Sequence, residues 1–317
     1  MADIITLGEL LVDLTQTGVN EKGVRLFAAN PGGAPANVAV ALSRLGVKAG
    51  FIGKVGKDTF GKDLRAVLEQ NGVDTRGLYE TDALTTQAVV SVSPDGERSF
   101  AFYRSPGADT LLTADEALAA LDPLPRILHI GSVSLTAEPE RSATLQAAEY
   151  AKQHGALISY DPNYRAALWS DEATAIEWMK KPLALCDILK LSDEELPLLT
   201  GTDDPAEGTK QLQACGISLI LLTLGSKGTY FRFGELTGTV PSVRIQVADT
   251  NGAGDTFLGA LLRGLALRGE KPFEGLDEAS LTALVRFANC AAALTCTRPG
   301  AIPAMPTLPE VEAFVRG

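Results

Sequence analysis

The chain has 317 residues, of which 45% are hydrophobic and 21% are charged. This mixture is ordinary for a globular protein and excludes a disordered chain or a small disulfide scaffold. The formal net charge of −11 opposes attraction to nucleic acid and to anionic lipid, so an anionic ligand would have to be held by local groups.

Short β-branched runs alternate with longer amphipathic stretches along the chain. The expected strands are residues 3–8, 48–54, 126–131, 156–161, 186–190 and 218–224. The expected helices are residues 35–45, 58–70, 138–154, 171–181, 205–215, 252–268 and 278–296. This alternation is typical of βαβ units, so the sequence predicts an α/β fold with a doubly wound, mostly parallel sheet.

Two segments break this rhythm because they look like antiparallel strands. Residues 86–103 contain two alternating runs joined by Pro94-Asp95-Gly96, and residues 10–28 are extended with a turn expected at 20–23. Such strands cannot enter a parallel sheet in sequence, so we expect a small separate sheet. It would form either a lid over a ligand cleft or an edge hairpin without a role in binding.

The chain shows no linker, internal repeat or low-complexity tract. Its length allows two domains of about 150 residues, but we expect residues 1–317 to form one domain with a discontinuous lid at about 10–28 and 86–104. Its start lacks the pattern of a signal peptide, and no uninterrupted apolar stretch of about 20 residues predicts a membrane span. The 4 cysteines include no C-x-x-C pair, so we expect buried free thiols and a cytoplasmic protein.

A pair of glycines precedes the first expected helix. Gly32 and Gly33 are followed by small residues, so the backbone can come close to a ligand there. Asn37 falls one turn into the helix, and its amide offers the donor and the acceptor that suit a hydroxyl-rich ligand. A tight loop beside a closely packed helix would explain the same residues.

The strongest pattern is VADTNGAGDTFLGALLRGL at residues 247–265. Gly252, Ala253 and Gly254 lead directly into a helix, whose free N–H groups and positive dipole end would form an anion site. Asp255 lies among these donors, where it could accept a proton from an alcohol next to the anion. Phosphoryl transfer to an alcohol needs this arrangement, although Asp255 could instead be an acid that stabilises the first helical turn.

Two other classes of nucleotide-binding protein do not fit the chain. No G-x4-G-K-[ST] string is present, which excludes a P-loop kinase. The segment after the first expected strand is GELLVD and contains no G-x-G-x-x-G, so a dinucleotide-binding dehydrogenase is not expected.

The two glycine patterns together resemble both motifs of the ribokinase-like, or phosphofructokinase-B, family of carbohydrate kinases. These motifs are G-G-x-x-x-N at residues 32–37 and D-T-x-G-A-G-D at residues 249–255. Within this family the chain is most similar to fructokinases, in the segments GGAPANVAVALSRLG, FYRSPGADTLL, SYDPNYRAALW and KLSDEE. The resemblance covers essentially the whole chain and implies a three-layer sandwich with a small β-sheet lid.

The resemblance implies that the chain transfers the γ-phosphoryl group of ATP to the primary hydroxyl of a ketohexose. Fructose is the expected sugar. Mg²⁺ would accompany the ATP, and some members of the family also use K⁺. A 2-keto-3-deoxygluconate kinase and a riboside or nucleoside kinase are alternatives within the family. A catalytically silent sugar-binding protein is an alternative of a different class.

The resemblance also implies a role for each matching residue. Asp255 would be the catalytic base, and the amides of Gly252, Ala253 and Gly254 would stabilise charge on the phosphates. The implied sugar contacts are Asp13, Gly32, Gly33, Asn37, Tyr103 and Arg165. The implied nucleotide contacts are Lys190, Glu195, Thr223, Gly225, Ser226, Gly228 and Asn289. Asp249 and Asn251 resemble the monovalent-cation site of the family.

One position departs from the family pattern. Ser192 stands where the family usually has Asn, and the run from Ser192 to Glu195 also fits a helix capping box. Glu195 could therefore cap a helix, or it could act on Mg²⁺ through water.

The resemblance also implies an assembly. Lid sheets of this family commonly pair between subunits, which predicts a homodimer through the lid. Apolar lid residues such as Phe102 could serve that interface, or they could cover the active site of their own subunit.

Overall fold

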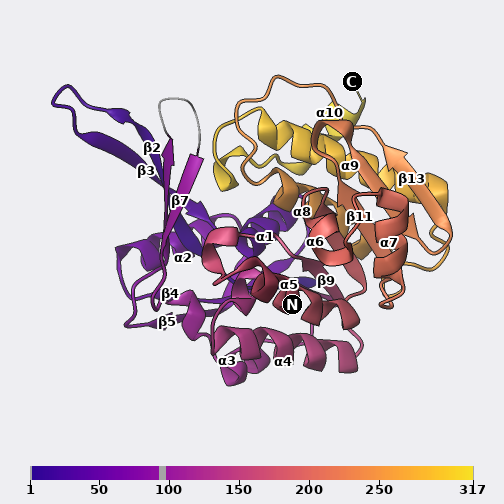
Figure 1. Cartoon of the computed structure of the whole chain (residues 1–317), viewed down its shortest axis with the longest axis horizontal. Helices are drawn as coiled ribbons and strands as arrows, with labels where there is room; N and C mark the ends of the chain where they lie inside the picture. The colour runs from indigo at the N-terminus through magenta and orange to yellow at the C-terminus, as the bar shows by residue number, and fades with distance from the viewer. Residues whose placement is uncertain (1, 93–97, 317) are drawn as a thin grey trace.

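A computed structural model describes residues 2–92 and 98–316 of the chain. Its centre is a 9-stranded sheet with the strand order β13-β12-β11-β10-β9-β8-β1-β4-β5 (Figure 1). The strands are β1 (Ile4–Leu7), β4 (Ala49–Gly56), β5 (Asp74–Thr81), β8 (Ile127–Gly131), β9 (Leu157–Asp161), β10 (Ile188–Ser192), β11 (Leu219–Thr223), β12 (Thr229–Phe233) and β13 (Leu236–Val240). The strands from β5 to β11 in this order pair in parallel, whereas β12 and β13 pair antiparallel at one edge.

Helices cover both faces of this sheet. One face carries α1 (Ala34–Arg44), α2 (Thr59–Gln70), α8 (Ala253–Ala266), α9 (Glu278–Cys296) and α10 (Leu308–Arg316). The other face carries α3 (Ala114–Ala119), α4 (Glu140–Gln153), α5 (Glu172–Lys180), α6 (Glu195–Thr200) and α7 (Pro205–Gln213). Successive strand residues point to opposite faces, so Ile4 and Ile5 belong to different core clusters. The predicted three-layer α/β sandwich is confirmed.

The small separate sheet is also confirmed. It has 4 strands in the order β3-β2-β6-β7, which are β2 (Leu11–Val19), β3 (Arg25–Gly32), β6 (Gln87–Val92) and β7 (Arg98–Tyr103). Figure 1 shows β2 and β3 extending away from the rest of the molecule. The expected turn at 20–23 is present, with the amide of Gly23 donating to the carbonyl of Asn20. The expected turn at Pro94-Asp95-Gly96 lies outside the described residues.

The structure adds elements that the sequence did not predict. β5, β12 and β13 are three strands of the main sheet, and α3 and α6 are helices of only 6 residues each. β13, the edge strand, alternates partly exposed and exposed residues over Leu236–Thr239, as an antiparallel strand with one solvated face does. β3 also continues to Gly32, so the small sheet reaches the glycine pair rather than ending near residue 28.

α9 is long and apolar enough to cross a membrane by length and composition alone, but 44% of its apolar window is buried, and it packs against α8 as a core helix does.

All four cysteines are free, yet only Cys186 and Cys290 are buried. The prediction of buried thiols was wrong for Cys215, which is exposed in the turn after α7.

Candidate active site

The first turn of α8 is the centre of the candidate site. Gly252 caps the helix with a φ of 73°, a left-handed conformation that favours glycine. A Cβ at this position would lie 2.9 Å from the Cβ of Ala301. The helix begins at Ala253 and places Asp255 in its first turn. The predicted helix N-terminus is therefore present, with Asp255 where the free amides converge.

Two cavities meet at this helix N-terminus. A cavity of about 560 Å³, the carboxylate cavity, is lined by Gly252 and Asp255. A second cavity of about 590 Å³, the apolar cavity, is lined by Ala253 and Gly254. Thr250 lines both. One turn of helix thus separates two ligand-sized spaces, and its amides and its carboxylate lie at the boundary.

The carboxylate cavity brings together most of the expected sugar contacts. Asp13 from β2, Asn37 from α1 and Asp255 from α8 line it, and so do Gly33 and Arg165. They come from segments far apart in the chain, on the main body and on the small sheet.

The two glycines allow close packing in this cavity. A Cβ on Gly32 would lie 2.3 Å from Oδ2 of Asp13, so only glycine lets that carboxylate lie against the strand. Gly33 has a φ of 110°, and a Cβ there would lie 2.3 Å from the carbonyl oxygen of Glu9. The amide of Ala34 then donates to Oε1 of Glu9 at 2.8 Å.

Asp255 is held by a neighbour from the early glycine motif. The Nδ2 group of Asn37 donates to Oδ2 of Asp255 at 2.8 Å. Burial raises the pKa of Asp255 to about 6, although the Asn37 hydrogen bond opposes this rise. Burial likewise raises the pKa of Asp13 to about 6, against the nearby charge of Arg165. Both carboxyl groups are therefore ionised at neutral pH but take up protons in mild acid.

A buried ion pair lies beneath the helix N-terminus. Nζ of Lys190 is 2.8 Å from Oδ2 of Asp161, and a Cβ on Gly254 would lie 3.1 Å from the same Nζ. Burial alone would lower the pKa of Lys190, but nearby carboxylates, Asp161 first, raise it above the usual value. Lys190 is therefore a permanent cation beside the first turn of α8.

Asp161 was missed by the sequence analysis. It ends β9, and Lys190 lies on the neighbouring parallel strand β10. The carboxyl ends of parallel strands form the ligand-binding edge of such sheets, so the position of Asp161 as the last residue of an expected strand was the available signal.

The apolar cavity contains the expected nucleotide loop. Thr223, Gly225, Ser226 and Gly228 line it. Apolar side chains complete the walls, among them Val243, Phe257 and Ala292. Such a surface can cover the flat face of an adenine.

Asn289 also lines this cavity, but its amide is already engaged. Its Oδ1 accepts from the hydroxyl of Thr229 at 2.8 Å, and its Nδ2 donates to the carbonyl of Val240 at 3.1 Å. In this structure Asn289 shapes the wall of the apolar cavity by linking α9 to β12 and β13.

Tyr103 is placed differently from the other expected sugar contacts. Its side chain is 67% exposed, while the neighbouring Phe102 lines the carboxylate cavity. Adjacent residues of a strand face opposite ways, so the structure does not bring Tyr103 to the cavity.

Glu195 takes part in the capping box that the sequence suggested. Its Oε2 accepts from the amide of Ser192 at 2.8 Å, and its own amide donates to the hydroxyl of Ser192 at 3.3 Å. Its Oε1 accepts from the amide of Tyr164 at 2.7 Å. Both carboxylate oxygens of Glu195 thus accept hydrogen bonds from backbone amides. The neighbouring residue Glu194 is exposed and lines the carboxylate cavity.

The expected cation-site residues lie at the entrance to α8. Oδ1 of Asp249 accepts from the amide of Asn251 at 3.1 Å, and Oδ2 accepts from the amide of Gly300 at 2.9 Å. No group of three or more His, Cys, Asp or Glu side chains able to hold a metal ion occurs among the residues that the structure describes.

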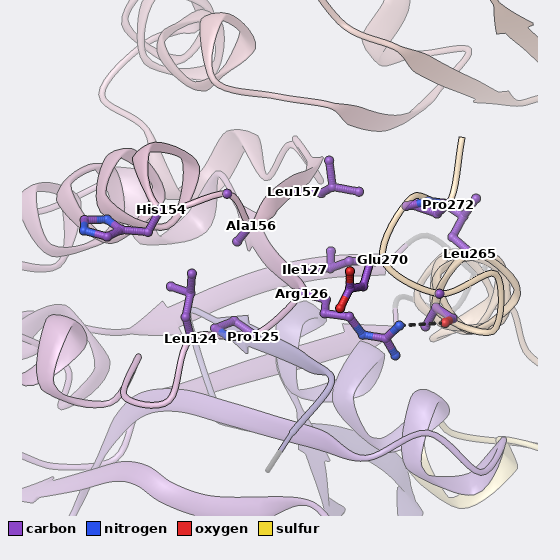
Figure 2. A pocket seen from close by; sticks show the side chains of 13 residues that line it. Leu124, Pro125, Arg126, Ile127, His154, Ala156, Leu157, Leu265, Glu270 and Pro272 are labelled. Carbon is purple, nitrogen blue, oxygen red and sulfur yellow. Dashed lines mark hydrogen bonds between the residues drawn. The ribbon is translucent and has the colours of Figure 1, made fainter. Parts of the chain in front are cut away.

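A further cavity of about 350 Å³ lies at the other end of α8 (Figure 2). It is lined by Arg126, His154 and Glu270, and Nη1 of Arg126 donates to the carbonyl of Ala266 at 3.0 Å. This cavity lies where β8 and β9 begin. Ligand sites of parallel sheets lie at the opposite, carboxyl ends of the strands, so it is not the candidate active site.

Comparison with known proteins gives one consistent result. The profile of the pfkB family carbohydrate kinases matches residues 1–308. Fructokinase-1 of Zea mays is 45% identical over 312 residues, which are 97% of this chain and 96% of that protein.

Two solved structures agree with this match. Fructokinase of Xylella fastidiosa with bound ATP superposes with a TM-score of 0.91 at 35% identity, over 100% of this chain and 99% of that one. Fructokinase of Vibrio cholerae O395 with fructose, ADP and a calcium ion superposes with a TM-score of 0.88 at 34% identity, over 99% of both chains.

Proposed function

The chain belongs to the pfkB family of carbohydrate kinases, and we propose that it transfers the γ-phosphoryl group of ATP to the primary hydroxyl of fructose. One observation carries this proposal most directly, namely that the first turn of α8 separates the carboxylate cavity from the apolar cavity. A sugar on one side and a nucleotide on the other would meet at Asp255. The fructokinases among the similar proteins favour fructose as the sugar.

The carboxylate cavity supplies the groups that the sugar needs. Asp255 takes the proton of the primary hydroxyl as its oxygen attacks phosphorus, and a loose transition state does not require a strong base. Asp13 accepts hydrogen bonds from sugar hydroxyls, and Asn37 keeps the carboxylate of Asp255 in place. Arg165 at the cavity wall donates to a hydroxyl or a phosphate.

The nucleotide side uses backbone amides and one buried cation. The amides of Gly252, Ala253 and Gly254 and the ammonium group of Lys190 stabilise negative charge on the transferred group. The adenine lies in the apolar cavity, whose described lining comes from residues 223–296.

The oxygen atoms at this site are suitable ligands for metal ions. Carboxylate oxygens such as those of Glu194 suit Mg²⁺, which keeps several waters and is held largely by the substrate phosphates. Mg²⁺ would neutralise phosphate charge when it arrives with ATP. The carboxylate of Asp249 and the carbonyl oxygen of Asn251 are oxygen ligands of the kind that would hold K⁺.

The surroundings of Arg104 bear on which sugar is used. A carboxylated substrate such as 2-keto-3-deoxygluconate needs a cation near the small sheet. The side chain of Arg104 is only 6% exposed and is paired with Asp109 and Glu140, so it is not offered to a ligand. Arg104 is therefore not the partner of a substrate carboxylate, and Arg165 is the arginine that lines the carboxylate cavity.

A coupled assay of ADP release with a panel of sugars tests the proposed function. We expect turnover with fructose to exceed turnover with ribosides and with 2-keto-3-deoxygluconate by at least tenfold in kcat/KM. Equal or greater turnover with another sugar would remove fructose as the substrate, and no ADP release with any sugar would remove the kinase activity.

The acid limb of the pH profile should report two carboxyl groups. The pKa values of Asp13 and Asp255 are both raised to about 6, and each group acts only when ionised. We therefore expect log kcat/KM to be level above pH 7 and to fall below pH 6 with a slope between one and two. The Asp13→Asn variant should show lower activity and a slope of one. A wild-type profile that stays level down to pH 4.5 would contradict these roles.

We also propose that the small sheet is a lid on a single kinase domain, residues 1–317, and that two subunits pair through it. The expected lid segments at about 10–28 and 86–104 extend to Gly32 in the structure. Val24 and Leu26, just before and just inside the start of β3, lie on one face of the small sheet and are exposed, so a second subunit would cover them.

Sedimentation of the wild-type chain should show a dimer, and Val24→Glu with Leu26→Glu should shift it to a monomer. A wild-type monomer at working concentrations would contradict the dimer.

The free thiols support a cytoplasmic enzyme, which fractionation of cells that express the chain would check.

A further inference from the structure

A buried cluster of charged side chains lies next to the carboxylate cavity, and none of the steps above uses it. Arg104 is at its centre and follows β7 directly. Its Nε donates to Oδ2 of Asp109 at 2.7 Å, and its Nη2 donates to Oε2 of Glu140 at 2.8 Å. Its Nη1 donates to the hydroxyl of Thr136. The guanidinium group thus joins the end of the small sheet to the body of the protein.

The cluster is also tied to the other strands of the small sheet. Thr86, just before β6, donates its hydroxyl to Oδ1 of Asp109 at 2.5 Å. Glu9 precedes β2, and its carboxylate accepts from the amide of Ala34, just beyond the end of β3. Glu9 also acts on Arg104 through its charge, so groups at the base of all four strands of the small sheet lie in or near this cluster.

The packing here leaves little room for movement. A Cβ on Gly107 would lie 1.9 Å from the Oγ1 of Thr86 and 2.9 Å from the Cγ of Arg104. Thr86, Asp109 and Glu140 are each at most 1% exposed. The base of the small sheet is thus fixed by tight contacts as well as by charge.

The charges in the cluster depend on a single guanidinium group. Burial would lower the pKa of Arg104, but the carboxylates of Asp109, Glu140 and Glu9 raise it. Burial raises the pKa of Glu9 to about 7 and that of Glu140 well above its usual value. Without Arg104 the buried Asp109 would lose its ion-pair partner, which is unfavourable for a buried carboxylate, and Glu9 and Glu140 would take up protons more readily.

We propose that Arg104 is a positioning residue for the sugar. It holds the base of the small sheet so that Asp13, on β2, and Gly33, after β3, keep their places in the carboxylate cavity. The proposal rests on the proposed function and deepens it, because it assigns to a buried cluster the task of fixing the sugar side alone. The described lining of the apolar cavity comes from residues 223–296, so nucleotide binding should not depend on Arg104.

The test compares Arg104 with a matched arginine on the other side of the molecule. Arg232 is 9% exposed, and its Nε donates to the Oγ1 of Thr209 at 2.9 Å. We expect Arg104→Met to raise KM for fructose at least tenfold and to leave KM for ATP within twofold. Arg104→Lys should recover part of the loss because an ammonium group can pair with one carboxylate. Arg232→Met should lower Tm and leave both KM values within twofold.

A milder pair of variants keeps the test decisive if Arg104→Met does not fold. Thr136 accepts from Arg104 and donates to the carbonyl of Val133, while Thr209 accepts from Arg232 and donates to the carbonyl of Pro205. Thr136→Val should raise KM for fructose about threefold, and Thr209→Val should not change it. Equal rises in both KM values, or a fall in Tm alone, would show that Arg104 stabilises the fold and does not position the sugar.

The wild-type chain in the same assay separates this proposal from the proposed function. If it fails to phosphorylate fructose but uses another sugar, the proposed substrate is wrong. The Arg104 variants are then assayed with that sugar, and binding of an ATP analogue is measured directly. A change in sugar KM without a change in nucleotide affinity supports the positioning role, and its absence overturns that role.

Discussion

Replacement of Asp255 by Asn is expected to lower kcat by about 10²–10⁴-fold, the usual range for loss of a general base. The amide side chain has nearly the same shape, and its oxygen can still accept the hydrogen bond that Asn37 donates at 2.8 Å. Affinities for fructose and ATP should therefore stay close to those of the wild type. Steady-state kinetics and calorimetric titration with each substrate measure the two quantities separately.

Asp187→Asn is a suitable control for this variant. Asp187 is 8% exposed, and its Oδ1 pairs with Lys152 at 2.6 Å, but it lies just before β10, at the end of the sheet away from the site. We expect Asp187→Asn to lose stability and to keep kcat within twofold. An Asp255→Asn variant that retains more than a tenth of the wild-type rate would show that Asp255 is not the base.

Replacement of Lys190 by Met should reduce both stability and activity. Its partner Asp161 has a side chain that is 3% exposed, and breaking a buried ion pair by removal of one partner costs about 3–5 kcal/mol. Loss of a group that stabilises transition-state charge lowers kcat by about 10²–10³-fold. The double variant Lys190→Met with Asp161→Asn should regain much of the Tm but not the kcat, because the phosphate would still lack its cation.

Lys54 offers the matched control for Lys190. Its side chain is 10% exposed and pairs with Glu116 at 2.7 Å, and it also donates to the carbonyl of Leu111. Lys54→Met should lower Tm while leaving kcat within twofold. If the double variant at Lys190 and Asp161 recovered wild-type kcat, Lys190 would be a structural residue and not a phosphate contact.

Predictions about the fold succeeded where a segment had a strong pattern of its own. The parallel strands β8 to β11 are mostly apolar because both of their faces are buried. β5, β12 and β13 were missed because polar residues and glycines interrupt their apolar positions, as at Gly77 in β5 and Gly238 in β13. Cys215 was misplaced for a similar reason, since a turn residue at the surface has no periodic pattern that would reveal its exposure.

The position of the helix start at the candidate site was predicted because its signal is local. The amides before Asp255 converge because they begin a helix, and a glycine run before a helix is visible in the sequence. The cluster of Glu9, Arg104 and Glu140 has no such signal, because its members are joined only when distant segments pack. The exposed position of Tyr103 likewise depended on which face of β7 turns inward.

The sequence by itself determined the α/β class, the separate small sheet and the helix start at Gly252 that carries the candidate base, Asp255. These follow from hydrophobic periodicity and helix-end chemistry, which depend on neighbours in the chain. Only the tertiary structure decided that Asn37 would hold Asp255 across 218 residues of sequence, that Asp161 would pair with Lys190, and that Arg104 would be buried rather than offered to a ligand. Such contacts depend on the free energy of packing whole elements together, and a buried charge finds its partner only in the folded chain.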